Sequence, residues 1–507
     1  MANILGIDLG TTYCVMSTCD DTGSIQLVPN KDGETLTPSV IDLSNLEKPI
    51  VGKSAQKFIG KKPNIINRFK RNMNDENKNY DINGKTFTPT ELTTILLKYL
   101  SDSAETALGD ISEVTITVPA TFTDLGRKNT RQAAEDAGLN VKYIINEPTA
   151  AAIYYNFENL IQNEGKYAIF DLGGGTFDVS IADFKDFDLS IISSDGSHKL
   201  GGLDFDDELK NIAWTKYKNF TGKEMKNVQG FLAEQKKKEL TDYDETIFDE
   251  VQDADVTVTR KAFEESIAKY IAQIKMLCEK VMNDIKIKPE RIDGVVLAGG
   301  STRMPIIKKV AKEIFKTDPI ITGNPDVSIS MGAAFYCLYK ADQGGKIKLS
   351  AAQEKKVANT NISDVANYFY GTRVLAADVL QSNPFNPEKE NFIIVKKNTK
   401  LPFSKTEPVY TSVPNQRGLR CTVTESKLDT KDLKYVNIIA EDELELPPGL
   451  EYGSQVDVTY TATEDGMMKC SYKCLESGKT KTIDVNISAQ TTKTKVTDSD
   501  IDQFEID

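Results

Sequence analysis

The chain has 507 residues and a formal net charge of −13, and its sequence pI is about 5.0, so nucleic acid and anionic membranes are disfavoured as main partners. The length suggests about three or four domain-sized units. We find neither a leader-like segment nor an apolar stretch of membrane-spanning length, and we therefore expect a cytoplasmic protein without membrane or nucleic-acid partners. Seven scattered cysteines indicate reduced thiols. The single histidine, His198, is predicted to lie in a surface turn.

Two segments of similar sequence each predict a buried strand followed by a glycine turn. Residues 4–12 and 168–176 both run from apolar residues into Asp-Leu-Gly and then into small, hydroxyl-bearing residues. Glycine lets the backbone turn sharply with its N–H groups facing an anion, and an aspartate at the strand end is a suitable ligand for magnesium. One such turn alone is usually a plain hairpin. Because Asp8 and Asp171 lie about one domain length apart, the repetition predicts duplicated lobes that share one phosphate clamp.

Two further glycine turns follow later in the chain. Gly299 and Gly300 come after an apolar run at 294–298 and before a helical pattern at 306–315, where a helix N-terminus would favour an anion. Residues 201–206 contain the fourth turn, for which an ordinary loop remains the stronger interpretation when it is taken alone. Walker A, protein-kinase and dinucleotide-binding signatures are missing from the sequence. The predicted clamp therefore belongs to a different class of nucleotide-binding protein.

The ordered set of motifs resembles the 70 kDa heat-shock (DnaK-like) chaperone family. The matching segments lie at 6–12, 118–120, 146–152, 170–178, 200–202 and 299–305. This resemblance implies an α/β, actin/hexokinase-like ATPase of two duplicated lobes at 1–341. It also implies ATP or ADP with Mg²⁺ as cofactors, unfolded or extended peptides as ligands, and a J-domain co-chaperone and a nucleotide exchange factor as partners.

The same resemblance implies roles for individual residues. Lys70 would reach the γ-phosphate and orient the attacking water, although by sequence alone it could belong to a solvated basic patch. Glu147 and Asp171 would position water and magnesium beside Thr176, and Asp8 and Asp171 would hold the metal through water. Pro119 and Arg127 would relay between the nucleotide and a second domain. The expected nucleotide-binding residues are Gly10, Thr11, Thr12, Gly173, Gly174, Gly175, Gly201, Gly202, Glu234, Lys238, Thr241, Gly299, Gly300, Ser301, Arg303 and Asp326.

The last third of the chain differs from the rest in its hydrophobic periodicity. Residues 342–364 show little periodicity and indicate a linker, whereas 365–488 alternate between polar and apolar positions as in an all-β sandwich. This region resembles the family's peptide-binding domain. The remaining residues, 489–507, are polar and acidic and predict a short tail without a helical lid, so a bound peptide should leave fast. The peptide-site positions implied by the resemblance are smaller and more polar than is usual in the family: Thr372, Leu375, Val409, Ser412 and Leu419.

Three functions remain open at this point. An ATP-hydrolysing chaperone should change its peptide affinity with its nucleotide state. A non-refolding co-chaperone or scaffold should bind ATP tightly and turn it over weakly. A small-molecule kinase on the same ATPase fold would need an acceptor-binding insertion and a catalytic base, whereas this chain carries a predicted sandwich instead.

Overall fold

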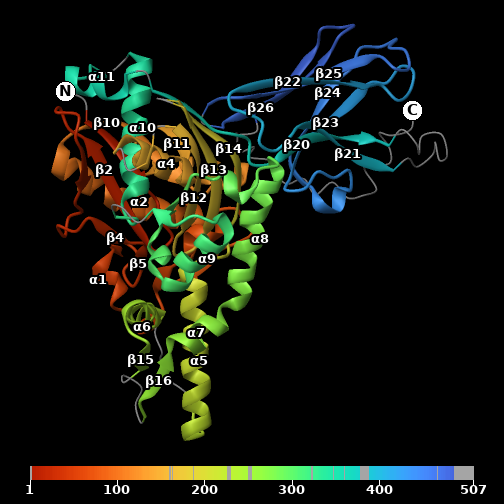
Figure 1. Ribbon diagram of the computed structural model, residues 1–507. Coiled ribbons are helices and arrows are strands. Elements are labelled where there is room, and N and C mark those ends of the chain that lie inside the picture. The colour runs from red at the N-terminus through yellow and green to blue at the C-terminus, as the bar shows by residue number, and fades with distance from the viewer. Residues whose placement is uncertain are drawn as a thin grey trace.

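The computed structural model shows a two-lobed α/β part with an all-β sandwich beside it (Figure 1). The structure describes residues 3–158, 161–162, 164–185, 188–224, 230–248, 254–320, 324–345, 348–358, 360–376, 388–464 and 466–484. The expected lidless tail at 489–507 lies outside the described residues. No described helix has both the length and the apolar content needed to cross a membrane.

The two lobes are built on sheets with the same strand order. The first sheet runs β11-β10-β1-β2-β3, with β4 beside β2, and the second runs β18-β17-β12-β13-β14, with β19 at its edge. Each lobe thus has an antiparallel meander followed by two parallel strands on the other side, which confirms the predicted duplication. The first-sheet strands are β1 (Asn3–Asp8), β2 (Tyr13–Cys19), β3 (Ile25–Val28), β4 (Leu36–Pro38), β10 (Ile111–Val118) and β11 (Val141–Asn146). The second-sheet strands are β12 (Glu164–Leu172), β13 (Phe177–Lys185), β14 (Asp188–Ser197), β17 (Gly294–Ala298), β18 (Pro319–Ile320) and β19 (Asn361–Ser363).

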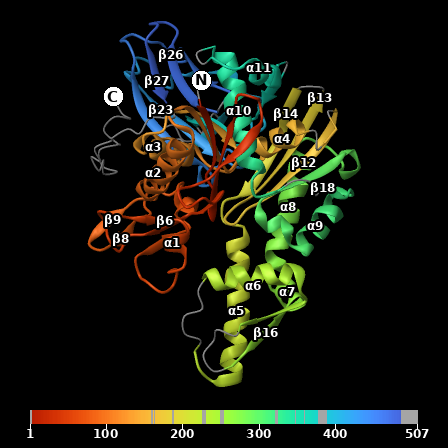
Figure 2. The ribbon, with the colours of Figure 1, turned by 90° about the vertical axis from the view of Figure 1, so that its left-hand side faces the viewer.

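Amphipathic helices cover the outer faces of both sheets (Figure 2). In the first lobe these are α2 (Pro89–Leu108), which begins with a capping box at Thr88, and α3 (Asp124–Asp136), capped by Thr123. In the second lobe, α8 (Ala268–Asp284) and α9 (Pro305–Phe315) cover the sheet, whereas α5 (Gly202–Thr221), α6 (Gly230–Asp242) and α7 (Arg260–Ser266) extend away from it (Figure 2). The smaller elements are α1 (Lys53–Gln56), β5 (Val40–Asp42), β6 (Ile50–Val51), β7 (Ile65–Asn67), β8 (Tyr80–Ile82), β9 (Lys85–Phe87), β15 (Glu245–Phe248), β16 (Val256–Thr259), η1 (Phe69–Asn72), η2 (Pro289–Arg291) and η3 (Gly300–Arg303).

Two helices, α4 (Glu147–Phe157) and α10 (Ser328–Gly344), pack closely between the lobes. Small residues allow this approach: a Cβ atom on Gly332 would collide with the carbonyl of Ala150, and one on Gly6 would collide with the backbone of Ala334. Both helices share a buried cluster with strands of the two sheets. The lobes are therefore joined at this end by a tightly packed core.

Residues 342–364 differ from the irregular linker that the sequence suggested. In their described part α10 continues to Gly344, α11 (Ala351–Val357) follows, and β19 pairs in parallel with β14. The helix forms because Ser350 and Gln353 make a capping box, and Val357 is buried against the interlobe core. Local capping and tertiary packing thus order a segment whose hydrophobic periodicity is weak. The boundary at residue 341 stays a prediction.

The C-terminal part is a sandwich of two four-stranded sheets, β21-β20-β23-β24 and β22-β25-β26-β27. The predicted alternation is confirmed in β25 and β26, where Val456, Val458, Cys470 and Cys474 are buried and their neighbours are more exposed. Val485 and Ile487, also predicted to alternate, lie outside the described residues. The elements are β20 (Phe369–Leu375), β21 (Lys389–Val395), β22 (Phe403–Tyr410), β23 (Gly418–Ser426), η4 (Leu433–Tyr435), β24 (Asn437–Glu445), β25 (Gln455–Ala462), β26 (Met468–Cys474) and β27 (Thr480–Asp484).

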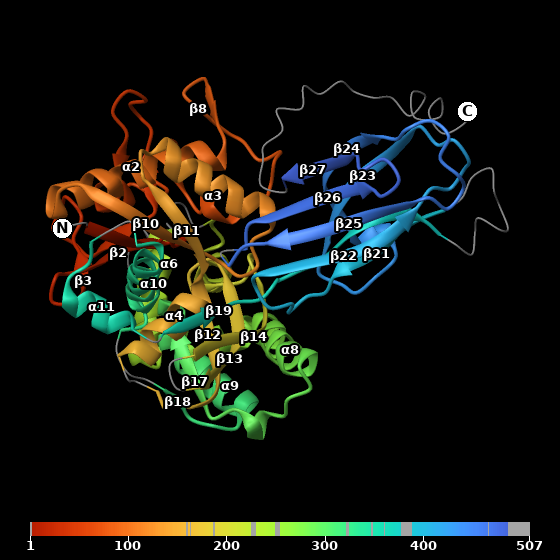
Figure 3. The ribbon, with the colours of Figure 1, turned by 90° about the horizontal axis from the view of Figure 1, so that it is seen from above.

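The sandwich is docked on the α/β part near α3 and α8 (Figure 3). Lys397 is 5% exposed and lies 2.6 Å from Asp195 on β14 and 3.2 Å from Asp284 at the end of α8. The Tyr368 hydroxyl donates a 2.6 Å hydrogen bond to the carbonyl of Thr121 in the first lobe. The sandwich therefore contacts both lobes.

Candidate functional site

The glycine turns of the two lobes meet between β1 and β12. A Cβ atom on Gly174 would lie on the Thr12 hydroxyl, and one on Gly175 would collide with Thr11. A Cβ on Gly201 would lie 2.6 Å from the carbonyl oxygen of Gly174. A Cβ on Gly202 would likewise lie 2.5 Å from the Ser301 hydroxyl, and one on Gly299 would lie 2.5 Å from the carbonyl oxygen of Leu172. The four glycine turns, at 10–12, 173–176, 201–206 and 299–303, are therefore packed against one another, and we call them the rim.

Lys70 lies inside this rim on η1 and is buried. Its side chain is 4% exposed, and its ammonium nitrogen lies 2.6 Å from Oε1 of Glu147, the first residue of α4. Burial by itself would lower the pKa of Lys70, but the negative charges of Glu147 and Asp8 outweigh it and raise that pKa. Lys70 is therefore a buried, positively charged side chain that is fixed by an ion pair. This placement excludes the alternative that Lys70 belongs to a solvated basic patch.

Three further carboxylates surround the Lys70–Glu147 pair. Asp8 ends β1 and Asp171 lies at the equivalent place on β12, while Asp178 lies opposite Asp171 on β13. Burial, reinforced by Glu147, raises the pKa of Asp8 to about 7 and that of Asp178 to about 8, and it raises the pKa of Asp171 as well. With one ammonium among four carboxyl groups, the cluster has an excess of negative charge that a cation would relieve.

The donor set of this cluster suits a magnesium ion held through water. Among the described residues, Oδ2 of Asp171, Oδ2 of Asp178 and Oγ1 of Thr12 are buried without a hydrogen-bond partner. Hard oxygen ligands of this kind fit Mg²⁺, which usually keeps several of its waters. Within the same described ranges no three Asp, Glu, His or Cys side chains are close enough together to ligate one ion directly. The residues present therefore fit a hydrated metal bound together with phosphates.

The expected adenosine residues on α6 form one wall at the mouth of the site. Lys238 pairs with Glu234 at 2.7 Å, and the Tyr13 hydroxyl from the first lobe donates to Glu234 at 3.3 Å. Thr241 is half-buried one turn further, where its carbonyl accepts a long 3.5 Å bond from Arg260. Glu234 and Lys238 therefore lie together against Tyr13 of the first lobe.

The opposite wall comes from the turn after β17. The Ser301 hydroxyl donates to the carbonyl of Gly173 at 2.9 Å, and Arg303 pairs with Asp326 at 2.7 Å. A Cβ on Gly300 would lie 2.7 Å from Oδ1 of Asp326. Gly300, Ser301, Arg303 and Asp326 are thus brought together with the rim.

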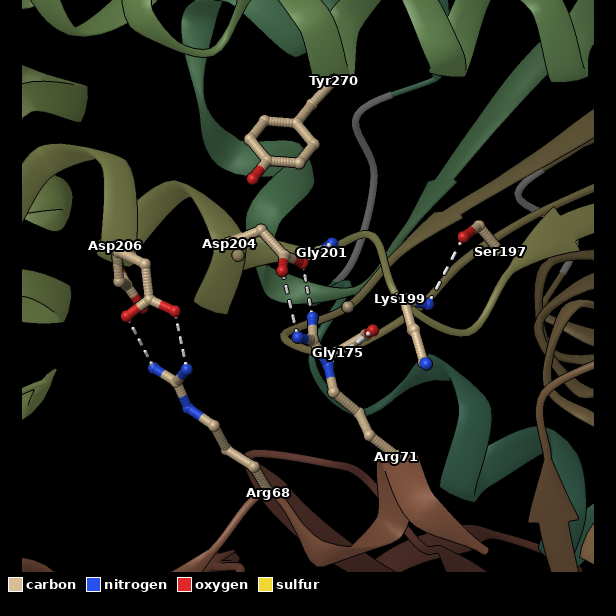
Figure 4. A network of polar contacts seen from close by, with 12 residues as sticks. Arg68, Arg71, Gly175, Ser197, Lys199, Gly201, Asp204, Asp206 and Tyr270 are labelled. Atoms are coloured by element: carbon tan, nitrogen blue, oxygen red, sulfur yellow. Dashed lines mark hydrogen bonds and ion pairs between the residues drawn. The ribbon is translucent and has the colours of Figure 1, made fainter. Parts of the chain in front are cut away.

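Several residues that hold this site together were not predicted. Arg71 reaches from the first lobe to Asp204 of α5 with bonds of 3.1 and 2.5 Å and donates to the carbonyl of Gly175 at 3.0 Å (Figure 4). Lys237 lies 2.8 Å from Asp206 and donates to the carbonyl of Gly202 at 2.9 Å. Lys237 lies three residues after Glu234, so helical spacing could have identified it, whereas no sequence signal joins Arg71 to Asp204.

The positions expected to bind peptide differ in their exposure. Thr372 is 2% exposed because its hydroxyl lies in the sandwich core, bonded to Tyr472 at 2.8 Å. Val409 and Leu419 lie on opposite sheets and are half-buried, as are Leu375 and Ser412. Thr372 therefore faces the core rather than a ligand in this arrangement.

The predicted relay residues lie in the first lobe, and His198 directly follows β14 of the second lobe. Pro119 is buried in the loop after β10, and Arg127 on α3 donates to Asn146 and lines the cavity between this lobe and the sandwich. His198 is half-buried rather than at the surface, and burial lowers its pKa to about 4. Because its conjugate acid has a pKa of about 4, this imidazole is a weak base and is neutral near pH 7.

Comparison with known proteins agrees with this geometry. The family model described as Hsp70 protein matches residues 4–505. The chain is similar to the chaperone protein DnaK of Thermosipho melanesiensis, with 31% identity over 502 residues that cover 95% of this chain and 80% of that protein. The match spans the rim, the Lys70 pair and the sandwich together. The chain therefore belongs to the Hsp70 family.

Proposed function

We propose that the rim between the lobes binds the phosphates of ATP and that Lys70 and its neighbouring carboxylates hydrolyse it. As a member of the Hsp70 family, the chain is an ATP-dependent chaperone and an ATP hydrolase, and members bind ATP or ADP with Mg²⁺. Neither the scaffold nor the kinase alternative is favoured by the family match. The observation that carries the proposal is the buried Lys70–Glu147 pair, set among carboxylates with unpartnered oxygens inside a ring of glycine turns.

The proposed hydrolysis depends on charge and position rather than on covalent catalysis. Lys70 holds a positive charge where negative charge develops on the transferred phosphoryl group, and Glu147 fixes the direction of that ammonium and orients a water. The magnesium ion, when bound, neutralises phosphate oxygens. Backbone N–H groups of residues 10–12 and 173–176 supply further donors. Thr176 is 6% exposed and adds a hydroxyl at this point.

The nucleoside is proposed to lie between the walls formed by α6 and the turn after β17. Glu234 and Lys238 offer polar groups on one side, and Ser301, Arg303 and Asp326 offer them on the other. The existing pairs among these residues hold the side chains in place before a ligand arrives, which reduces the entropy lost on binding.

The finer partner assignments are also proposals. Hsp70 proteins bind unfolded polypeptides and co-chaperones, and we assign a J-domain protein and a nucleotide exchange factor to the latter class. Extended peptides would bind the sandwich. We also propose a cytosolic location, which is supported by seven free cysteines, all of them buried.

The decisive experiment replaces Lys70 by alanine. Because the ammonium acts mainly in the transition state, single-turnover hydrolysis should fall by about two orders of magnitude or more, while calorimetric affinity for MgATP stays within a few-fold. Equal losses of binding and rate would refute the assigned role. Lys236→Ala, on the charged helix α6, is the matched lysine control and should hydrolyse ATP at the normal rate.

A further inference from the structure

Two buried carboxyl groups lie near each other where the sandwich meets the first lobe. Asp124, the first residue of α3, is 7% exposed, and Glu425 on β23 is 1% exposed. Glu425 is the cross-strand partner of Tyr370 on β20, whose ring lines the cavity between the two parts together with Arg127. The carboxyl groups therefore lie in the interface and not on a free surface.

Glu425 makes no hydrogen bond of ordinary geometry within the described ranges. The backbone N–H of Asp124 and the Tyr370 hydroxyl face its carboxyl group and lower its pKa, as does the charge of Arg127, whereas burial and the charge of Asp124 raise it. The Tyr368 hydroxyl lies in the same surroundings, because burial and then the charge of Glu425 raise the pKa of Tyr368. Asp124 in turn faces Arg127 and Lys128. Arg127 is shared, because its guanidinium also donates to Asn146. The nearby cations therefore do not fully offset two ionised groups at this position.

The protonated form of the pair is the favoured one in the docked arrangement. Burial first, and then the charge of Asp124, raises the pKa of Glu425 to about 8. Burial likewise raises the pKa of Asp124 to about 7, against the pull of Arg127 and Lys128. Once the sandwich separates from α3, both groups would face water and return to ordinary values near 4. The docked form therefore holds more protons than the separated form between about pH 4 and pH 8.

We propose that Asp124 and Glu425 form a proton-binding site, so that docking of the sandwich on the first lobe takes up a proton at each group. Because an acid with a raised pKa opposes the docked state once it is ionised, docking weakens as the pH rises from about 4 and levels off above about 8. Linkage sets the slope: for each proton taken up, the docking constant falls about tenfold per pH unit within that window.

The test follows docking directly in the full-length chain. Dyes on the exposed positions Asp110 and Glu451, each changed to cysteine, report the distance between the lobe and the sandwich by energy transfer, since the seven native cysteines are buried. The docking constant is measured from pH 5.5 to 8.5, with and without saturating MgATP. Since both groups hold their protons only in the docked form, the wild-type chain should lose between about tenfold and a hundredfold in docking per pH unit between pH 6 and 7.5.

Glu425→Gln keeps the shape of the side chain and removes its ionisation. Its docking should have at most half the logarithmic slope of the wild type, and at pH 8 it should dock at least tenfold more tightly. Asp124→Asn should act in the same direction. Glu443→Gln, an exposed glutamate on neighbouring β24, is the matched control and should keep the wild-type slope. Equal slopes in wild type and Glu425→Gln, or wild-type docking that is absent or independent of pH, would overturn the proposal.

Discussion

Arg71 offers the sharpest test of how the two lobes are held closed over a ligand. Its guanidinium makes two bonds to Asp204 and one to the carbonyl of Gly175, and the side chains of Arg71 and Asp204 are 13% and 16% exposed. Arg71→Ala removes these three Arg71 bonds between the lobes. It leaves Lys70 and the four carboxyl groups around it unchanged. We expect it to weaken nucleotide binding by favouring an open cleft.

The magnitude follows from the contacts. A hydrogen bond to a charged group contributes about 1.5–3 kcal/mol, but partial exposure and the new hydration of Asp204 reduce the sum, so we expect about 2–3 kcal/mol for closure. Since each 1.4 kcal/mol is a factor of ten, the apparent Kd for ADP should rise about 30- to 100-fold. Arg68→Ala is the matched control, because its pair with Asp207 is 29% and 41% exposed and should contribute no more than about 1 kcal/mol.

The assay is isothermal titration of the full chain with ADP and magnesium, which avoids turnover. Arg71→Lys should give an intermediate Kd, because it keeps the charge but cannot form the bidentate contact. If Asp204→Ala lowers the affinity as much as Arg71→Ala and the double variant adds little, the pair acts as one unit. An Arg71→Ala affinity within twofold of the wild type, or a loss no larger than that of Arg68→Ala, would refute the reasoning.

Two other substitutions test the rim and the sandwich. Gly174→Ala places a methyl group on the Thr12 hydroxyl and should reduce the calorimetric affinity for ADP tenfold or more. Its control is Gly344→Ala, which meets open space and should leave that affinity unchanged. A normal Kd for Gly174→Ala would contradict the close packing of the rim. Tyr472→Phe removes hydrogen bonds of 2.8 Å to Thr372 and 2.6 Å to the carbonyl of Thr422 and should cost about 1–3 kcal/mol in urea unfolding of the sandwich. Tyr452→Phe, 68% exposed, should change the unfolding free energy by less than about 0.5 kcal/mol, and equal effects of the two would exclude the proposed core contact.

The parts of the fold that repeat were accessible from the sequence. The two Asp-Leu-Gly turns are local patterns, and the same pattern at the ends of β1 and β12 places Asp8 and Asp171 at equivalent points of two similar sheets. Alternation in β25 and β26 is equally local, because one face of each strand is buried. Such features depend on neighbours within a few residues, and single-sequence periodicity contains that information.

Features that depend on packing against distant segments were missed or misplaced. Residues 351–357 lack a long periodic pattern, yet they form α11 because the Ser350–Gln353 capping box is reinforced by bonds that Gln353 donates to the carbonyls of Cys19 and Asp20, more than 300 residues away. Thr372 was assigned to a peptide pocket, but Tyr472 from the opposite sheet bonds its hydroxyl in the core. In both cases the deciding partner lies on an element that the local sequence does not identify.

The buried Asp124–Glu425 pair in the interface is the clearest case of a feature that the sequence alone does not predict. It is also the feature on which the regulatory hypothesis rests. A glutamate in an alternating strand is normally a solvated residue, so Glu425 carries no signal by itself, and Asp124 is a common choice for the first turn of a helix. Only their meeting across the docked surface turns two ordinary acids into a pair whose pKa values are raised to about 8 and about 7. Since Lys397 and Asp195 fasten the same surface through an ion pair whose carboxylate has a lowered pKa, raising the pH toward 8 weakens one contact and leaves the other intact. Docking is then opposed at α3 while it is retained at β14.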